Sequence, residues 1–111
     1  MACTFEIYKD KAGKFRYRMR AANKEIILSG QAYKSKASCK NGIASIKKNS
    51  KKDARYDRFK ARNGKLHFNL KAANHQVIGV SQGYASASGC TNCIKRIKSD
   101  AGRAKIIDLT K

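Results

Sequence analysis

Apolar and polar residues alternate strictly near the start of the chain. Apolar residues recur at every second position, at Phe5 and Ile7 in the segment 4–9 and at Phe15, Tyr17 and Met19 in the segment 15–20. Successive side chains of a β-strand point to opposite faces, so both segments are predicted to be strands with one buried and one polar face. A polar stretch around Gly13 separates them and predicts a tight turn.

A third strand is predicted at residues 25–28, and a helix follows it from the N-cap residue Ser35 to about Lys48. The apolar residues Cys39, Ile43 and Ile46 are spaced by four and then three positions, which is typical of a buried helix face. The second half of the chain repeats this order. It predicts strands at 54–60, around the inward residues Leu66, Phe68 and Leu70, and at 75–78. A helix capped by Ser86 follows, with Cys90, Ile94 and Ile97 on its buried face, and a last strand is predicted at 105–109.

The two halves are copies of one unit. Residues 13–47 align without a gap on residues 64–98, at a constant offset of 51 positions. Such a match through loops, strands and a helix indicates duplication of a whole supersecondary unit. In a chain of 111 residues neither half alone can bury a stable core. We therefore expect one domain, residues 1–111, made of the repeats 4–54 and 55–105 with a shared core, and closed by the strand at 105–109.

The shared core is expected to hold the inward residues of both copies. These are Phe15, Tyr17, Met19, Ile43, Ile46, Leu66, Phe68, Leu70, Ile94 and Ile97. The last strand has no further repeat to begin, so it is expected to pair within the sheet and to interlock the two copies.

Four segments in order resemble the YegP-like family of bacterial tandem-repeat domains. They are residues 5–10, 21–28, 39–47 and 68–74, and the resemblance covers nearly the whole chain. It implies an α+β fold: a single antiparallel sheet built from two tandem β(3)-α-β repeats with interlocked last strands, and both helices on one face. It implies no particular activity. The chain departs from the family pattern at Cys93, where Gly42 predicts a glycine, and at Lys95-Arg96, which replace small residues.

Positive charge is the second large feature of the sequence. Lys and Arg number 26 and Asp and Glu number 7, so the formal net charge is +19, and both halves share the excess. Self-repulsion of this size opposes folding, and a polyanionic partner is one explanation. A basic surface that serves only solubility is the alternative.

Two groups of cations are candidates for phosphate contacts. Arg16, Arg18 and Arg20 share the polar face of one strand, and the homologous strand offers Lys71. The exposed sides of the two helices carry the second group: Lys36, Lys40, Lys47, Lys48, Lys95, Arg96 and Lys98. A polar outer sheet face and a solvated helix face are also ordinary structural features, and this interpretation stays open for both groups.

These observations favour a small, basic, non-enzymatic protein that binds DNA or RNA through phosphates with weak sequence preference. A protein-interaction or assembly module, whose basic surface meets an acidic protein or serves solubility, is the alternative. Under either hypothesis the protein is expected to be a monomer with an internal pseudo-twofold axis, or a weak homodimer. No apolar run approaches the roughly 18 residues of a membrane-spanning helix, no secretory signal is visible, and the expected location is the cytoplasm.

Catalytic and cofactor motifs are not found in the sequence. The pair Cys90-x-x-Cys93 is half of a zinc site, but Cys39 and Cys90 fall on the apolar helix faces, where cysteine acts as a small buried residue. The sequence therefore favours structural thiols over a metal or redox site, and predicts neither cofactor nor metal. The two histidines lack an acidic partner in the sequence, and no phosphate-binding or hydrolase motif is found.

Overall fold

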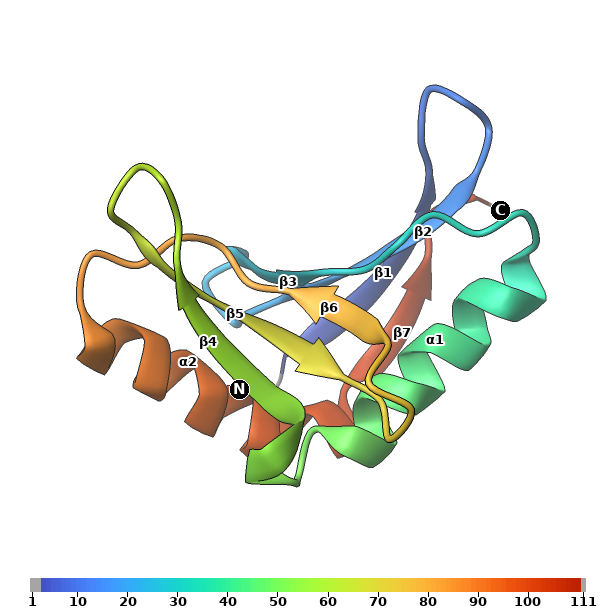
Figure 1. The fold of residues 1–111 in the computed structure, drawn as a ribbon. Helices are drawn as coiled ribbons and strands as arrows, with labels where there is room; N and C mark the ends of the chain where they lie inside the picture. Colours follow the sequence, from blue (N-terminus) through green and yellow to red (C-terminus); the bar gives the residue numbers. More distant parts are fainter. Residues whose placement is uncertain (1–2, 111) are drawn as a thin grey trace.

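A computed structural model describes residues 3–110. It consists of one seven-stranded sheet and two α-helices (Figure 1). The elements in chain order are β1 (Thr4–Lys9), β2 (Phe15–Arg20), β3 (Ile26–Ser29), α1 (Lys36–Asn49), η1 (Asp53–Arg55), β4 (Tyr56–Lys60), β5 (Leu66–Lys71), β6 (Val77–Val80), α2 (Ala87–Asp100), η2 (Ala101–Arg103) and β7 (Lys105–Asp108). The strand order in the sheet is β4-β5-β6-β3-β2-β1-β7.

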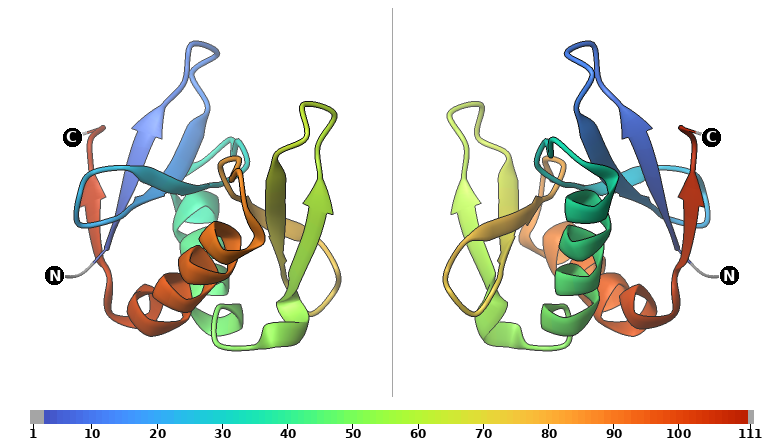
Figure 2. Two further views of the ribbon diagram at one scale, coloured as in Figure 1. Left: turned by 90° about the vertical axis from the view of Figure 1, so that its left-hand side faces the viewer. Right: turned by 90° about the vertical axis from the view of Figure 1, so that its right-hand side faces the viewer.

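Both helices cover the same face of the sheet, as predicted (Figures 1 and 2). The Ser35 hydroxyl accepts a hydrogen bond from the Ser38 backbone N–H, and the Ser86 hydroxyl accepts one from that of Gly89, so both predicted N-caps are confirmed. Such a cap satisfies one of the free backbone donors of the first helical turn.

The first three strands of each half are related by the internal repeat. β3 pairs with β6 in the middle of the sheet through Ser29 and Val80, which lie 51 positions apart. On either side of this centre lies an antiparallel hairpin, β1–β2 and β4–β5. The two hairpin loops rise from the sheet on the side away from the helices (Figures 1 and 2). Gly13 and Gly64 occupy equivalent positions in these loops with φ near +80°, a conformation that glycine adopts without steric cost.

β7 makes the sheet mixed rather than wholly antiparallel. It crosses to the far edge and pairs in parallel with β1, with Ile106 beside Phe5, so the predicted interlocking of the copies is confirmed. Strands joined by a short turn are antiparallel, but β7 follows a helix, and its direction was therefore not fixed by turn chemistry. At the opposite edge β4 has no second partner among residues 3–110. Its charged residues Asp57, Arg58 and Lys60 are of the kind that protects an edge strand.

The core forms one cluster between the sheet and the helices. All of the predicted core residues are buried except Phe15 and Leu66, which are half-buried at one end of their strands. Phe5 and Ile7, the inward residues of β1, are also buried completely. The predicted strand at 54–60 begins instead with the short turn of 3₁₀ helix η1. No helix among the described residues is long and apolar enough to cross a membrane.

Candidate nucleic-acid interface

The face of the sheet turned away from the helices carries polar, charged and aromatic side chains, and is called the open face. Its residues come from the two hairpins: Glu6, Tyr8, Arg16, Arg18 and Arg20 from β1 and β2, and Asp57, Phe59, His67, Asn69 and Lys71 from β4 and β5. These two sets correspond one by one at the offset of 51 residues. Strand alternation explains the arrangement, because the residues between them face the core.

The three arginines of β2 lie on the open face, as predicted, but each is paired with an acid. Arg18 and Arg20 both donate through Nε to Glu6 Oε1, at 2.7 and 2.8 Å, and Arg16 Nε donates to Asp10 Oδ2 at 2.8 Å. Burial raises the pKa of Glu6, but the hydrogen bonds and charges of Arg20 and Arg18 outweigh it and hold that pKa below its usual value. Three guanidinium groups against two carboxylates leave a net positive strand with fixed side chains.

The second hairpin repeats this arrangement with less charge. Lys71 Nζ lies 3.1 Å from Asp57 Oδ2, which corresponds to the pairing of Arg20 with Glu6. His67 Nδ1 is 3.2 Å from the Ser81 carbonyl oxygen. A carbonyl can only accept, so Nδ1 carries the proton.

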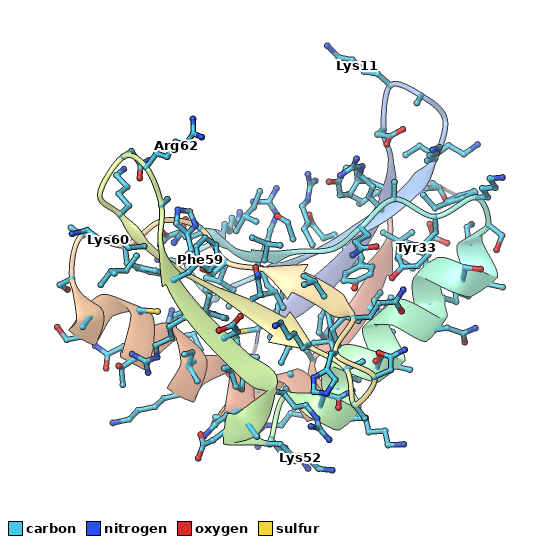
Figure 3. The ribbon with its side chains drawn as sticks, in the orientation of Figure 1. Lys11, Tyr33, Lys52, Phe59, Lys60 and Arg62 are labelled. Carbon is cyan, nitrogen blue, oxygen red and sulfur yellow. The ribbon has the colours of Figure 1, made fainter. Side chains whose placement is uncertain are left out.

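The hairpin loops supply further cations that the sequence analysis did not select. Lys11 and Lys14 in the first loop correspond at the same offset to Arg62 and Lys65 in the second, and all four are exposed. These four residues are called the loop cations. Lys11 and Arg62 extend from the tips of the two hairpins (Figure 3). Their recurrence at the offset of 51 was the signal in the sequence that could have identified them.

Two aromatic residues of the open face each lie against a nitrogen-containing side chain. The Arg18 guanidinium lies 4.3 Å from the centroid of the Tyr8 ring. In the other hairpin the rings of Phe59 and His67 stack with centroids 5.4 Å apart and an interplanar angle of 12°. Tyr8 and Phe59 are equivalent residues of the repeat. Neither was selected from the sequence, because their contacts with Arg18 and His67 depend on strand register.

The predicted cations of the helices lie on the other side of the molecule, so the structure does not bring the two predicted groups together. Lys36 is paired with Asp108 at 2.8 Å, and Lys98 with Asp53. Lys47 donates to the Ala104 carbonyl at 2.9 Å, which gives it a structural role. The remaining predicted residues on this side are exposed: Lys40, Lys48, Lys95 and Arg96.

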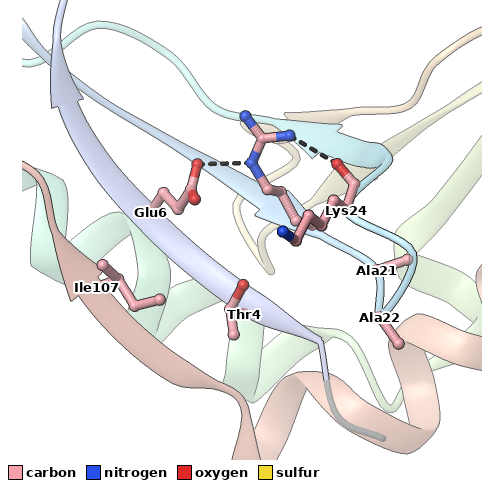
Figure 4. Close-up of a pocket in the computed structure, with 7 residues that line it drawn as sticks. Thr4, Glu6, Ala21, Ala22, Lys24 and Ile107 are labelled. Carbon is pink, nitrogen blue, oxygen red and sulfur yellow. Dashed lines mark hydrogen bonds and ion pairs between the residues drawn. The ribbon is translucent and has the colours of Figure 1, made fainter.

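A pocket of about 520 Å³ lies at the β1 side of the open face, between β1, the β2–β3 turn and β7 (Figure 4). Arg20 forms part of its wall, with Nε donating to Glu6 and Nη1 donating to the Lys24 carbonyl at 2.6 Å. Ile107 of β7 lies on the opposite wall. The lining of the pocket thus combines the cations Arg20 and Lys24 with the acid Glu6 and with apolar residues.

The cysteines are buried and carry no site chemistry in the structure. All four are free thiols, and no group of three or more metal-binding side chains occurs within residues 3–110. Burial raises the pKa of Cys3 and of Cys39 to about 11. The thiolate is the reactive form of cysteine, so these side chains are suited to packing rather than to nucleophilic or redox chemistry.

The sequence and fold are similar to those of bacterial proteins. Residues 10–57 and 61–108 each match the family described as "Domain of unknown function (DUF1508)". The chain is 49% identical to the UPF0339 protein in the ptx operon 5' region of Stutzerimonas stutzeri, over 98% of both chains. It is 44% identical to the UPF0339 protein YegP of Escherichia coli K12, over 99% of this chain and 100% of the relative. Neither relative is named as an enzyme.

Two solution NMR structures share the fold. One is that of a UPF0339 protein from Shewanella oneidensis, with a TM-score of 0.91 and 40% identity, covering 98% of this chain and 92% of that one. The other is that of YegP from E. coli, with a TM-score of 0.91 and 43% identity, covering 98% and 94% of the two chains.

Proposed function

We propose that this chain, which belongs to the DUF1508 family, binds nucleic acid through phosphate contacts on its open face, with weak sequence preference and without catalysing a reaction. The predicted resemblance to the YegP-like family is confirmed, because the chain is 44% identical to YegP of E. coli K12 over the full length of that relative. We place the protein in the cytoplasm, because four free thiols suit a reducing compartment.

The observation that carries the proposal is the repeated placement of cations around the open face. The loop cations stand at equivalent positions on the two hairpins, and within residues 3–110 their side chains form no ion pair with an acid. Arg16, Arg18 and Arg20 lie on the same face, in strand β2 of the first hairpin. A polyanion that follows the open face can therefore contact both hairpins at once, which raises affinity without any new type of contact.

Weak sequence preference follows from the kind of contact. Lysine and arginine side chains at loop tips bind phosphates, and phosphate contacts position a protein on nucleic acid without carrying base information. Neither α-helix lies on the open face to enter a major groove (Figure 1).

The proposal is tested by replacing the loop cations and measuring how binding depends on salt. We expect the variant in which Lys11, Lys14, Arg62 and Lys65 are all changed to Gln to bind a mixed-sequence oligonucleotide more weakly. Each phosphate contact contributes about 0.7 (single strand) to 0.9 (duplex) to the slope of log K against log salt. The slope is therefore expected to fall by about 3, as measured by fluorescence anisotropy.

A matched control removes the same amount of charge from the helix side, again as three lysines and one arginine. In this control Lys40, Lys48, Lys95 and Arg96 are all changed to Gln. We expect this control to lower the slope by less than 1. Equal losses from both variants would show diffuse attraction by net charge, and absence of binding by the unmodified protein in low salt would overturn the proposal. The arginines of β2 are less suitable for this test, because their removal takes away the ion pairs of Glu6 and Asp10.

A further inference from the structure

We infer that the open face selects single-stranded nucleic acid, and that unpaired bases stack on the two aromatic stations of the hairpins. The first station is Tyr8 with Arg18, and the second is Phe59 with His67. This inference rests on the proposed function, and adds to it the class of nucleic acid and the groups that recognise it.

The aromatic rings are placed where a core function does not explain them. Phe59 is directly opposite His67 in the β4–β5 ladder, and the neighbouring Phe68 points into the core. The Phe59 ring therefore lies on the open face, and the residue is 39% exposed. Exposing so large an apolar group has a hydrophobic cost, which a ligand that covers the ring would remove.

The repeat supplies a second observation. At the position equivalent to Phe59 the first hairpin has Tyr8, which also lies on the open face and also has a nitrogen-containing group, Arg18, over its ring. A base can stack on an aromatic ring or on the plane of a guanidinium group. Each hairpin thus offers a stacking surface next to its own loop cations, which provide phosphate contacts.

The spacing of the stations fits a strand of nucleic acid rather than one nucleotide. Tyr8 is in β1 and Phe59 in β4, which are five strand positions apart in the sheet. At about 4.8 Å for each position this corresponds to about 24 Å along the sheet. A single strand covers that distance in about seven nucleotides, at a phosphate spacing of about 3.4 Å for each.

A duplex cannot use these stations without losing base pairs. Its bases are stacked on one another and only their edges are open in the grooves. A single strand presents base faces at no such cost, and stacking on aromatic side chains is tolerant of sequence because every base has such a face. Charge complementarity alone would serve both forms, so the aromatic stations are what favours the single strand.

The experiment compares a 12-nucleotide oligo(dT) with an abasic strand of the same length and with a duplex. We expect the protein to bind oligo(dT) at least about tenfold more tightly than the abasic strand, since each stacked base contributes that order of affinity. Phe59→Leu and Tyr8→Leu keep an apolar side chain and are each expected to lower affinity for oligo(dT) by about tenfold, with binding of the abasic strand unchanged. Ile106→Ala is the control, because Ile106 is similarly exposed, at 44%, but on the helix side of the sheet.

A direct signal comes from Phe59→Trp, because the chain has no other tryptophan. Its fluorescence is expected to be quenched by oligo(dT) and not by the abasic strand. The same comparison with oligo(rU) shows whether DNA or RNA is preferred. Salt-dependent binding that is equal for oligo(dT) and the abasic strand would overturn the stacking inference and leave the phosphate contacts standing, whereas absence of binding to all probes would overturn both. Thermal melting of each variant confirms that it is folded.

Discussion

At the scale of single residues, two tyrosines and one glycine determine how α1 sits on the sheet. The Tyr17 and Tyr33 rings stack with centroids 6.0 Å apart, and the buried Tyr17 hydroxyl donates to the Ile78 carbonyl of the other repeat. A Cβ atom added at Gly42 of α1 would lie 2.7 Å from the Tyr17 ring and 2.7 Å from the Tyr33 hydroxyl oxygen. The helix can approach the sheet this closely only because residue 42 has no side chain.

This packing gives a prediction for Gly42→Ala. In an exposed helix the exchange stabilises by about 1 kcal/mol, but overpacking a buried site costs about 1–3 kcal/mol. We expect the free energy of unfolding, measured with urea, to fall by up to about 2 kcal/mol as the balance of these terms. A variant that is more stable than the unmodified protein would contradict the close contact of α1 with the tyrosines.

The second repeat differs from the first at this position. The residue of α2 equivalent to Gly42 is Cys93, which is buried. Its thiol lies 4.0 Å from the Ile27 carbonyl oxygen of the first repeat. The second helix thus packs a side chain where the first, against Tyr17 and Tyr33, has none.

At the scale of elements, β7 is held by an ion pair to α1 as well as by the ladder with β1. Lys36 Nζ lies 2.8 Å from Asp108 Oδ2, and the Asp108 side chain is only 11% exposed. The Thr110 hydroxyl and backbone N–H both donate to Asp108 Oδ1, at 2.6 and 2.9 Å. Lys36 and then Thr110 hold the pKa of Asp108 well below its usual value. The last strand is thus fixed to the first repeat by a charged contact.

The depressed pKa makes part of the stability depend on pH. In the unfolded chain Asp108 titrates near about 3.9, and in the folded protein at lower pH. The ionised Asp108 side chain therefore makes its full contribution to the stability of the folded state above about pH 5. This contribution is lost as the pH falls through the acidic range. We expect Asp108→Asn to lower the melting temperature by several degrees at pH 7, and the difference from the unmodified protein to narrow steadily as the pH falls from about 5 to about 2.

Asp53→Asn is the control for this measurement. Asp53 is also paired with a helix lysine, Lys98, but its side chain is 86% exposed, and surface ion pairs contribute little to stability. We expect its melting temperature to match that of the unmodified protein. A difference for Asp108→Asn that is constant from pH 7 to pH 2 would show that its effect does not come from the ion pair.

At the scale of the whole molecule, local patterns predicted the elements and the repeat predicted their shared core. Residues such as Tyr17 and Met19 could be assigned to the buried face because alternation and helix spacing are local properties of the sequence. The parallel pairing of β7 with β1 could not be predicted in this way, because it joins residues about 100 positions apart in the chain. Pairing of Glu6 with two arginines likewise depends on strand register, which the sequence does not state.

The candidate site was predicted in part for the same reason. Alternation placed Arg16, Arg18 and Arg20 together on one face, and the structure confirms that placement. The helix cations seemed equivalent from charge alone, but the layer order separates them from the arginines. Alternation also put Tyr8 on the polar face of its strand, but its contact with Arg18 and the stacking of Phe59 on His67 depend on strand register.

The central claim is that nucleic acid binds the open face, and amide chemical shifts measure this most directly. A titration of ¹⁵N-labelled protein with a 12-nucleotide single strand is expected to shift the amides of the β1–β2 and β4–β5 hairpins and their loops, around Lys11, Lys14, Arg62 and Lys65. The exposed faces of α1 and α2, around Lys40, Lys48 and Lys95, are expected to remain unshifted. Shifts concentrated on the helices, or no shifts at all in low salt, would contradict the account.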